Sequence, residues 1–461
     1  MGAVTLPYIA IENKVRDAVV AKDRKLAPSI RLESPNDHRL AKAMLILNDE
    51  KKVEGAIASQ TRNQTLQLHG ISVSMDGSVL REYVVCVFQT RVLAMYRSIS
   101  QSAWLAAARK QKKLTFQRVP VQDQRKEVRK VRMLSIRALY ALGLDYGVVK
   151  IGIGAARKMV VLQVVPGPKL NQEMENALVR SITQYIKQLK EPRIPLDRIV
   201  LGADPEFVMQ SPKGQLLIAS KYFPVRGKVG CDAIWLGQSH SNKPLVEIRP
   251  EPSSDPRTLV IRIYQGLMQA AKRMRNTPGK WLAGAMPYNG FSLGGHIHFS
   301  GIHPNFKMLR ALDNYLSLPL VAVEDERGKN RRPKYGFLGD FRYQYHGGFE
   351  YRTLPSWLIS PTLTKGVLVA AKLIVANYPT LKHNPLAEFT MQQAYYAGNK
   401  EKIAGLVESM WEDLKKLEDY KIYQKYLDSF YRYITSGEAW DERQDLRKVW
   451  RIPPYHRRKQ A

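Results

Sequence analysis

Hydrophobic and polar positions in the first 190 residues follow two different periods, which predicts a mixture of strands and helices. Residues 81–97 (REYVVCVFQTRVLAMYR) predict two strands joined by a short turn. The β-branched residues of 148–154 and 158–168 predict a second hairpin. Residues 131–147 and 171–190 carry apolar side chains at helical spacing, and the first of these segments closes at a glycine. We therefore expect an α+β region that ends before the proline-punctuated stretch EPRIPLDR.

The pattern changes near residue 198 and again near residue 386. Between these positions, short apolar runs alternate with ionisable residues, as in strands with one polar face. Residues 402–434 have the period of a packed pair of amphipathic helices. We therefore divide the chain into a region 1–192, a strand-rich domain 198–385 and a helical extension 386–461.

Four strand-like segments of the domain 198–385 carry two ionisable residues at positions i and i+2. These pairs are Asp204 and Glu206 in LGADPEFVM, Glu247 and Arg249 in PLVEIRPEP, His296 and His298 in GGHIHFS, and Glu350 and Arg352 in GGFEYRTLP. Residues two apart in a strand point to the same face, so the two members of each pair are expected to lie together. If the four strands form one sheet, one face of it gathers carboxylates, imidazoles and guanidinium groups.

Such a face suits a metal ion and a phosphate group. Carboxylates at this density repel one another unless cations lie between them, and oxygen-rich ligation favours Mg²⁺ or Mn²⁺ over zinc. Arginines on the same face would bind phosphate oxygens through paired hydrogen bonds. One pair alone, such as Glu350 and Arg352, is more often a structural ion pair, and the two histidines alone fit a half-buried core as well as a metal site. Four pairs together favour phosphoryl-transfer chemistry.

The same segments resemble the catalytic strands of glutamine synthetases. GADPEF is similar to their G-x-E-P-E-F strand with an aspartate for the first glutamate, GGHIHFS to G-x-H-x-H-x-S, and FEYRTLP to I-E-x-R-x-P. The order GADPEF, GxDxxxL, EIRPxP, GGHIHxS, YGxxxxFR, EYRTLPSW in residues 202–357 resembles more closely the phage-type carboxylate–amine (COOH–NH2) ligases, or amidoligases, of that superfamily. This resemblance implies an α+β fold, with a glutamine synthetase-like antiparallel sheet and helices in the catalytic domain.

The resemblance also implies roles for individual residues. It implies metal ligands at Asp204, Glu206, Glu247 and Glu350, catalytic residues at Arg352, His296 and Arg342, and cofactor-binding residues at Arg331, Arg352 and His296. Asp232 matches a family aspartate and fits a turn cap equally well, whereas His298 receives no role beyond support of its strand. The two glycines before His296 would let the backbone approach a nucleotide closely.

The implied reaction is ATP-dependent and Mg²⁺-dependent (or Mn²⁺-dependent) formation of an amide or isopeptide bond. A carboxylate attacks the γ-phosphoryl group of ATP, an acyl phosphate forms, and an amine displaces phosphate. Arginines and metal ions would stabilise the charge that develops on the transferred group. The implied partners are an amine and a carboxylate-bearing acceptor, either a peptide, a protein or a small amino acid.

The first region carries a second resemblance. ALGLDYGVVKIGI and MVVLQVVPGPKLN resemble the end of an ATP-grasp domain of the spore-coat-associated type, whose pattern GLDFGxVDI…YxxEVNPxP supplies three magnesium ligands. Here those positions are Lys150, Gln163 and Val165, so all three ligands are absent. Residues 1–192 are therefore expected to be a degenerate ATP-grasp-like half-domain that acts as a scaffold or binds a partner. A surface role for Lys150 and Lys169 is favoured over contact with an anion.

The helical extension resembles the helices that follow the ligase domain in the same family. EAWDERQDLRKVWRIPPY repeats the tryptophan-then-acidic pattern found there. Trp440 and Trp450 are expected to dock the tail on the catalytic domain rather than to form an exposed aromatic patch.

The net charge of the chain predicts a further class of binding partner. The 461 residues carry a formal net charge of +31, so the surface should attract an acidic polymer or nucleic acid. The basic residues are densest at Arg109, Lys110, Lys112, Lys113, Arg118, Arg125, Lys126, Arg129, Lys130, Arg132 and Arg137. This density fits an anion-binding arm and also a solvated basic face. Because no nucleic-acid motif accompanies it, the charge alone assigns no function.

Cysteine content and hydropathy bound the setting of the chain. Cys86 and Cys231 lie far apart in sequence and provide neither a disulfide framework nor a zinc quartet. No apolar stretch is long enough to span a bilayer, and the first residues lack the pattern of a secretory signal. A reduced, cytoplasmic setting is therefore expected, and the sequence is compatible with an oligomer.

Three functions remain open from the sequence. The first is the ATP-dependent carboxylate–amine ligase. The second is a structural or interaction protein of the virion or spore-coat type, whose basic surface binds nucleic acid or an anionic polymer. The third is a metal-dependent hydrolase, which would not need the arginines beside the carboxylates. The domain 198–385 keeps its ligand-type residues while the first region has lost them, and this contrast favours the active ligase.

Overall fold

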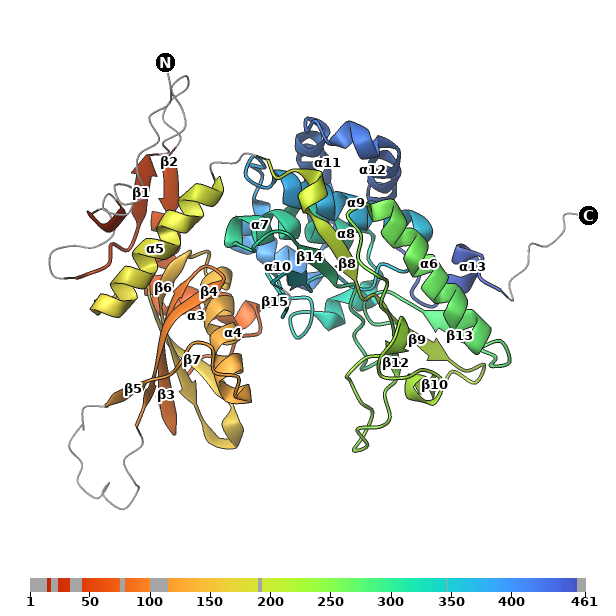
Figure 1. Cartoon of the computed structure of the whole chain (residues 1–461), viewed down its shortest axis with the longest axis horizontal. Coiled ribbons are helices and arrows are strands. Elements are labelled where there is room, and N and C mark those ends of the chain that lie inside the picture. The colour runs from red at the N-terminus through yellow and green to blue at the C-terminus, as the bar shows by residue number, and fades with distance from the viewer. Residues whose placement is uncertain are drawn as a thin grey trace, which may run out of the picture. The chain divides into compact units, whose positions relative to one another are not determined.

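The computed structural model of the chain describes residues 15–17, 24–33, 44–74, 79–99, 115–189, 193–345 and 347–453 (Figure 1). By its internal contacts the chain divides into two units, Met1–Glu191 and Pro192–Ala461. Both units combine antiparallel sheets with helices, and the end of the second unit is helical, so the predicted α+β class is confirmed.

The first unit is built on an antiparallel sheet with the strand order β5-β4-β3-β6-β7. Its strands are β3 (Arg81–Phe88), β4 (Arg91–Ser98), β5 (Phe116–Arg118), β6 (Tyr146–Ile153) and β7 (Met159–Val165). β3 pairs with β4 and β6 pairs with β7, so both predicted hairpins are confirmed. Outside this sheet lie the paired strands β1 (Ile30–Glu33) and β2 (Met44–Leu47) and the helices α2 (Glu50–Ile57) and α3 (Ser59–Leu68).

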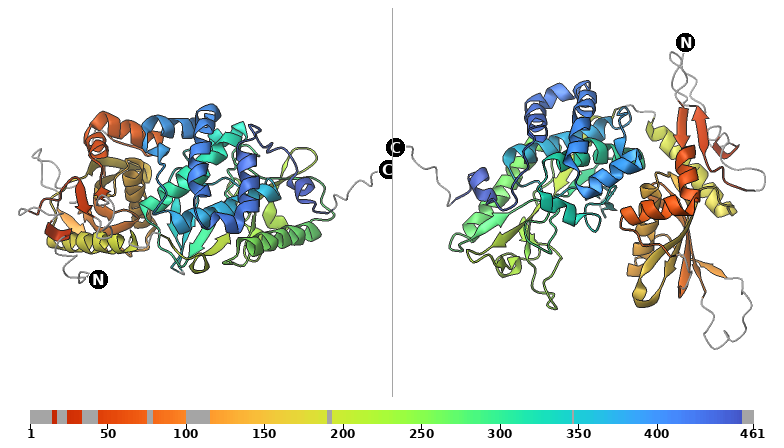
Figure 2. Two further views of the ribbon diagram at one scale, coloured as in Figure 1. Left: turned by 90° about the horizontal axis from the view of Figure 1, so that it is seen from above. Right: turned by 180° about the vertical axis from the view of Figure 1, so that it is seen from behind.

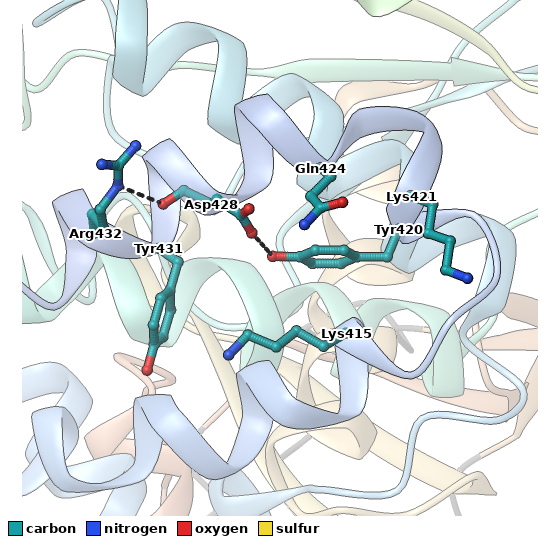
Figure 3. A pocket seen from close by; sticks show the side chains of 7 residues that line it. All are labelled: Lys415, Tyr420, Lys421, Gln424, Asp428, Tyr431 and Arg432. Atoms are coloured by element: carbon teal, nitrogen blue, oxygen red, sulfur yellow. Dashed lines mark hydrogen bonds between the residues drawn. The ribbon is translucent and has the colours of Figure 1, made fainter.

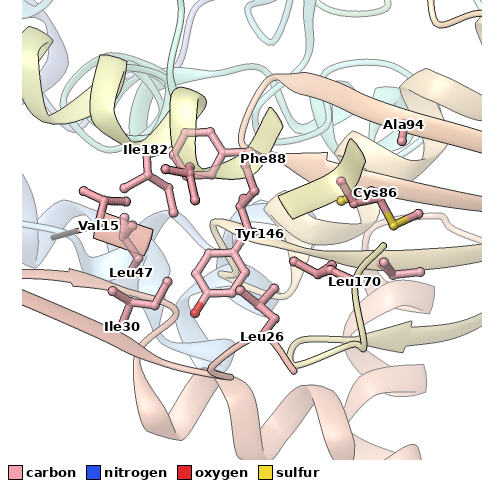
Figure 4. Packing of buried hydrophobic residues seen from close by; sticks show 14 of the residues in the cluster. Val15, Leu26, Ile30, Leu47, Cys86, Phe88, Ala94, Tyr146, Leu170 and Ile182 are labelled. Carbon is pink, nitrogen blue, oxygen red and sulfur yellow. The ribbon is translucent and has the colours of Figure 1, made fainter. Parts of the chain in front are cut away.

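Helices pack on both faces of this sheet because its central strands are apolar on both faces. Helix α4 (Lys126–Ala141) packs on β3, β6 and β7, and α5 (Gln172–Leu189) packs on β3 and β4. In the core under α5, Phe88 and Tyr146 of the sheet meet Ile182 of the helix (Figure 4). Both helices were predicted from the spacing of apolar residues, but α4 begins before the predicted segment 131–147 and ends at Ala141, because Tyr146 and Gly147 already belong to β6. Helix α4 ends before Gly143, whose φ of +73° suits glycine.

The densest basic stretch is only partly described. Arg109, Lys110, Lys112 and Lys113 lie outside the described residues. Most of the others are exposed around the end of β5 and on α4, which favours the solvated basic face for that part of the stretch.

The second unit contains two antiparallel sheets. One has the order β10-β9-β12-β11, with β13 also paired to β9, and the other has the order β15-β16-β14-β8. The strands of the first are β9 (Glu206–Gln210), β10 (Leu216–Leu217), β11 (Val229–Cys231), β12 (Leu245–Ile248) and β13 (Lys280–Leu282). The strands of the second are β8 (Val200–Ala203), β14 (Ile297–Ser300), β15 (Phe341–Tyr343) and β16 (Phe349–Tyr351).

The four segments with paired ionisable residues therefore do not share one sheet, and this corrects the expectation from the sequence. Glu206 and Glu247 belong to the first sheet, whereas His298 and Glu350 belong to the second. The chain passes from β8 to β9 at Asp204 and Pro205. Because proline has no N–H to continue a ladder of hydrogen bonds, β8 ends there. The chain then continues as β9, which pairs with strands of the other sheet.

The centre of the helices in the second unit is α9 (Pro361–Asn377), whose side chains are buried over almost its whole length. Figures 1 and 2 show it among its neighbours. Helices α6 (Pro256–Arg273), α7 (Phe306–Leu312) and α12 (Tyr420–Ile434) pack against it. The remaining helices are α8 (Leu318–Val323), α10 (Phe389–Ala397), α11 (Lys400–Lys415) and α13 (Leu446–Trp450). In the residues described, no helix combines the length and the apolar character that crossing a bilayer requires.

Two tryptophans fix the last described residues to the rest of the second unit. Both Trp440 and Trp450 are buried. The backbone N–H of Trp440 donates to the Val323 carbonyl at 2.9 Å, and Trp450 Nε1 donates to the Leu358 carbonyl at 2.8 Å. The predicted docking of the tail through these residues is confirmed.

A buried carboxyl group, Glu442, completes this attachment and predicts a pH dependence of stability. It accepts hydrogen bonds from the backbone N–H groups of Ala285 and Met286. Burial raises the pKa of Glu442 from 4.5 to about 7, and the charge of Glu324 adds to the rise. Between these two values the unfolded chain releases a proton that the folded chain keeps. The free energy of unfolding should therefore fall by roughly 3 kcal/mol as the pH rises from about 4.5 to about 7.

Replacing this residue isolates its share of the pH dependence. We expect Glu442→Gln to flatten the stability profile across that interval in urea unfolding measured at several pH values. Glu438→Gln, which changes an exposed neighbour, should leave the profile of the wild type unchanged. Equal slopes for wild type and Glu442→Gln would contradict the assignment.

Candidate active site

The passage from β8 to β9 brings the residues around Asp204 against the segment that enters β14. The N–H of Asp204 donates to the His296 carbonyl at 3.3 Å, and the N–H of Glu206 donates to the Gly294 carbonyl at 3.0 Å. In return, the N–H of Gly294 donates to Glu206 Oε2 at 2.8 Å. These bonds fix two predicted ligand segments beside each other where the two sheets meet.

Four side chains gather here, and we call Asp204, His296, His298 and Glu350 the histidine–carboxylate cluster. His296 Nδ1 lies 3.2 Å from Asp204 Oδ1 and 3.2 Å from Glu350 Oε1. His298 Nε2 lies 3.3 Å from Asp204 Oδ2. Both imidazoles therefore face Asp204, as the i, i+2 spacing predicts.

Strand register explains why these groups meet. His298 on β14 lies opposite Glu350 on one side and opposite Gly202 of β8 on the other. A Cβ at position 202 would lie 3.2 Å from the His298 Cβ, so the glycine leaves room for the imidazole. Arg342 of β15 lies opposite Glu350 and extends the same polar row.

The carboxylate of Glu350 is fully buried and is surrounded by side chains that donate hydrogen bonds or carry positive charge. Arg342 approaches its Oε2 with Nε at 2.8 Å and Nη2 at 2.6 Å, and Gln344 Nε2 donates to the same oxygen at 2.6 Å. Arg352 Nη1 lies 3.2 Å from Oε1. The side chain of Arg342 is 57% exposed and that of Arg352 only 25%, so both predicted catalytic arginines lie at the cluster and Arg352 is the more enclosed.

The charges within the histidine–carboxylate cluster favour the ionised form of Asp204 and the protonated form of His298. Burial opposes ionisation of Asp204, but the His296 and His298 imidazoles outweigh it and hold the pKa of this carboxyl group well below its usual range. Burial likewise opposes protonation of His298, but the neighbouring Asp204 carboxylate outweighs it and raises the pKa of the imidazole.

Glu206 and Glu247, which we call the glutamate pair, lie opposite each other on β9 and β12. Burial raises the pKa of Glu206 well above its usual range, and the charge of Asp232 adds to the effect. Burial and the charge of Asp204 raise the pKa of Glu247 to about 7, although Arg249 lowers it. The surroundings of the glutamate pair thus hold too little positive charge to favour two ionised carboxylates, and a bound cation would supply that charge.

The cluster fits a divalent cation. Asp204 Oδ1, His298 Nε2 and Glu350 Oε1 are buried and make no hydrogen bond of good geometry with the described residues. Ligand atoms of these three residues all lie within 4.8 Å of one another. Two carboxylates with one imidazole suit Mg²⁺ and, with its greater tolerance of nitrogen ligands, Mn²⁺. Elsewhere in the described residues, no other group of His, Cys, Asp and Glu has this spacing.

Arg331 is not brought into the cluster. Its side chain is buried, Nη1 donates to the Thr353 carbonyl at 2.7 Å, and Nη2 donates to the Leu354 carbonyl at 2.9 Å. Donors engaged by backbone carbonyls are not directed at a phosphate. These contacts hold Arg331 against the chain that follows Arg352, and its role in binding a cofactor stays a prediction.

Asp232 combines the two interpretations that the sequence left open. Its Oδ2 accepts a hydrogen bond from the N–H of Ile234 at 3.1 Å, which is a local turn cap. Its charge also raises the pKa values of Glu206 and Glu247.

Sequence reasoning left two members of this site without a role. His298 supplies one of the three buried, unbonded ligand atoms, and Gln344 donates to Glu350. His298 shares its strand face with His296, and this spacing was the signal available for it. Gln344 lies in a short irregular stretch after β15, where no sequence period shows which way a side chain points.

The two glycines of GGHIHFS are required by the packing of this chain itself. A Cβ at Gly294 would lie 2.2 Å from the His296 ring, and one at Gly295 would lie 2.3 Å from the Pro355 carbonyl oxygen and 2.5 Å from the Trp357 ring. Trp357 Nε1 also donates to the Gly295 carbonyl at 2.8 Å. The glycines therefore let the histidine and the tryptophan pack directly on the backbone.

In the first unit, the three positions of the ATP-grasp-like pattern form no ligand set. Lys150 and Gln163 are partners across β6 and β7, and Val165 ends β7. None of the three offers a carboxylate.

A hollow of about 730 Å³ lies between α11 and α12, away from the histidine–carboxylate cluster (Figure 3). Several of its ionisable groups are engaged with one another or with close neighbours. Tyr420 Oη donates to Asp428 at 2.7 Å, and Lys415 Nζ donates to Glu412 at 2.7 Å while lying 5.0 Å from the centre of the Tyr431 ring. None of the predicted site residues lines this hollow.

The sequence of the chain matches the model of one protein family. The family described as phage phiEco32-like COOH.NH2 ligase-type 2 matches residues 201–452, which is more than half of the chain. No curated protein matches the chain.

Two solved structures are similar to parts of the chain. A bifunctional glutathione synthetase from Pasteurella multocida is 12% identical with a TM-score of 0.31, over 52% of this chain and 48% of that chain. The ATP-grasp ligase PsnB, complexed with minimal precursor, Mg and ADP, is 15% identical with a TM-score of 0.18, over 39% of this chain and 56% of that chain. The chain spans about half the length of each, and at these TM-scores neither likeness defines a shared fold.

Proposed function

Because the chain belongs to the phage phiEco32-like COOH.NH2 ligase-type 2 family, we propose that it joins a carboxylate to an amine in an ATP-dependent reaction that passes through an acyl phosphate. The family that the motifs of residues 202–357 indicate is confirmed by this membership. A carboxylate and an amine as substrates follow from the family. ATP, the acyl phosphate and the residue roles belong to the proposal.

A carboxylate at neutral pH must be activated before an amine can attack it. In the proposed reaction a carboxylate oxygen bonds to the γ-phosphorus of ATP while the bond from that phosphorus to ADP breaks. The amine nitrogen then bonds to the acyl carbon, phosphate leaves, and the nitrogen loses a proton. Negative charge on the transferred phosphoryl group makes fixed positive charge the main requirement of the site.

The arrangement of this chain's residues meets that requirement. We assign Arg352 and the more exposed Arg342 to the phosphoryl oxygens, since both reach the cluster. Asp204, His298 and Glu350 would hold Mg²⁺ or Mn²⁺, and the glutamate pair would complete the ligation. When bound, the cation would neutralise charge on the phosphate oxygens.

His296 is assigned to orientation of the carboxylates. Its Nδ1 bridges Asp204 and Glu350, so it holds the two ligand groups at a fixed separation. In this role it is a positioning residue that acts through the carboxylates.

One observation carries the proposal. Asp204, His298 and Glu350 each have a buried polar atom without a good hydrogen bond, and ligand atoms of the three lie within 4.8 Å of one another. Two arginines stand at the same cluster. A purely structural polar cluster would be expected to satisfy those atoms internally.

The test is ADP release in the presence of Mg²⁺ or Mn²⁺, screened over pairs of carboxylates and amines. For a productive pair, Arg352→Ala should lower turnover by about 10²- to 10³-fold, because it removes a charge that stabilises the transferred group. Glu206→Gln should lower it by at least about tenfold and weaken the dependence on the cation. Arg443→Ala, which removes an arginine whose side chain is 78% exposed, is the control and should retain wild-type turnover.

Two results would contradict the proposal. In the first, ATP with Mg²⁺ or Mn²⁺ neither raises the melting temperature of the wild type nor is consumed with any pair. In the second, ADP is released at the same rate without an amine and no amide forms, which would indicate a hydrolase.

A further inference from the structure

The first unit contains a groove of about 810 Å³ between α5 and the beginning of β4. One wall is a stripe of α5 from Glu173 to Lys187, whose members recur every three or four residues and so share one helix face. Arg91–Leu93 of β4 and Pro120–Gln122 also line the groove. The groove lies within this single unit.

Within the described residues, Arg91–Leu93 form a sheet edge that no further strand covers. β5 pairs only with Tyr96–Ser98 of β4, and the N–H of Val119 reaches back to the Met95 carbonyl. Among the described strands, none pairs with Arg91–Leu93 on the side away from β3. An open edge of this kind can accept an extended chain through backbone hydrogen bonds.

Four basic residues line the groove: Arg91, Arg118, Arg180 and Lys187. The one acidic lining residue, Glu173, forms an ion pair with Arg118. The lining therefore carries a clear excess of positive charge, and the stripe from Glu173 to Lys187 is about 21 Å long at 1.5 Å per helical residue. That length matches about six residues of an extended peptide.

We propose that this groove docks an acidic, extended peptide segment of about six residues. The charge of its walls is complementary to a run of glutamates or aspartates, and the apolar Val92, Leu93 and Val121 would contact the stems of such side chains. Single-stranded nucleic acid fits less well, because the described residues that line the groove include no aromatic side chain to stack on a base.

The biological role of this docking rests on the proposed ligation. A peptide or protein substrate held by an acidic segment would be presented to the ligase at a raised local concentration. Docking needs neither ATP nor a metal ion, so it is measured separately from turnover.

The experiment measures fluorescence anisotropy of labelled hexaglutamate with the full chain, without ATP, at low and at physiological salt. The wild type should bind, and the affinity should fall as salt rises. The triple variant Arg91→Ala, Arg180→Ala and Lys187→Ala should weaken binding at least about tenfold. The matched control, Lys126→Ala, Arg129→Ala and Lys130→Ala, removes the same charge from exposed positions of α4 and should stay within about twofold of the wild type.

The alternatives give distinct outcomes. Equal losses in the two triple variants would show attraction by net charge alone and overturn the proposal, as would failure of the wild type to bind at low salt. Tighter binding of a labelled six-nucleotide thymidine strand, lost in the groove variant, would replace the peptide with nucleic acid. If the groove variant keeps full turnover of small substrates while losing hexaglutamate, the docking site stands apart from the catalytic proposal.

Discussion

Glu350→Gln should abolish metal-dependent turnover, with a loss of about 10³-fold or more. Glu350 provides one of the three converging ligand atoms, and its charge is the one on which Arg342, Arg352 and His296 all converge. Glutamine keeps the size of the side chain but removes the negative charge that both the cation and the arginines require. No other predicted site residue has as many charged partners.

The measurement that separates ligation from folding is thermal unfolding with and without Mn²⁺. The wild type should gain stability as Mn²⁺ is added, since an ion that binds only the folded chain stabilises it. Glu350→Gln should fold, as judged by circular dichroism, and show no such gain. Glu408→Gln, an exposed change on α11, should respond like the wild type. An unaltered Mn²⁺ response of Glu350→Gln would remove this residue from the proposed ligand set.

Gly295→Ala should be the most destabilising small change in the second unit that we consider, by about 3 kcal/mol or more. The added methyl would lie 2.3 Å from a backbone oxygen and 2.5 Å from the ring of Trp357, which is itself fully buried. A backbone carbonyl cannot turn aside as the end of a flexible side chain can. The strand that carries the histidines or the segment that carries the tryptophan must therefore move.

Urea unfolding checks this expectation, and the control is a glycine whose surroundings leave room for a methyl group. Gly405 lies inside α11 with open space where its Cβ would be. Gly405→Ala should stabilise the chain by about 0.5–1 kcal/mol, because alanine is the better helix former. Stability of Gly295→Ala equal to that of the wild type would show that the pair of glycines is not required by packing and would revive the nucleotide interpretation.

The spacing of apolar and polar residues along the chain was sufficient to predict several strands, helices and shared strand faces. The hairpins of the first unit follow from runs of β-branched residues, and the shared face of His296 and His298 follows from their spacing. The resemblance of residues 202–357 indicated the family, and most of the predicted site residues do meet. The domain assignments within the second unit and the roles of the site residues remain predictions.

What the sequence did not reveal depends on long-range pairing. β14 lies between β8 and β16, and nothing local to these strands specifies that order. Arg331 and Arg342 lie in one stretch of short elements, the 3₁₀ helix Glu326–Arg331 and the strand β15, yet one binds backbone carbonyls and the other binds Glu350. Side-chain direction in such a stretch follows from the contacts of the whole unit. For the same reason, the division of the ionisable pairs between two sheets could not be read from their spacing.

The junction at Asp204 and Pro205 has a consequence for how the site comes into being. Asp204 follows β8, His298 lies on β14 and Glu350 on β16, so the three ligand atoms converge only after strands distant in sequence have found their places. A fragment that stops before β16 has no site, and neither does a partly folded chain in which β14 is misplaced. Capture of the cation would thus be a late event in folding, and it would favour the completed topology over every incomplete one.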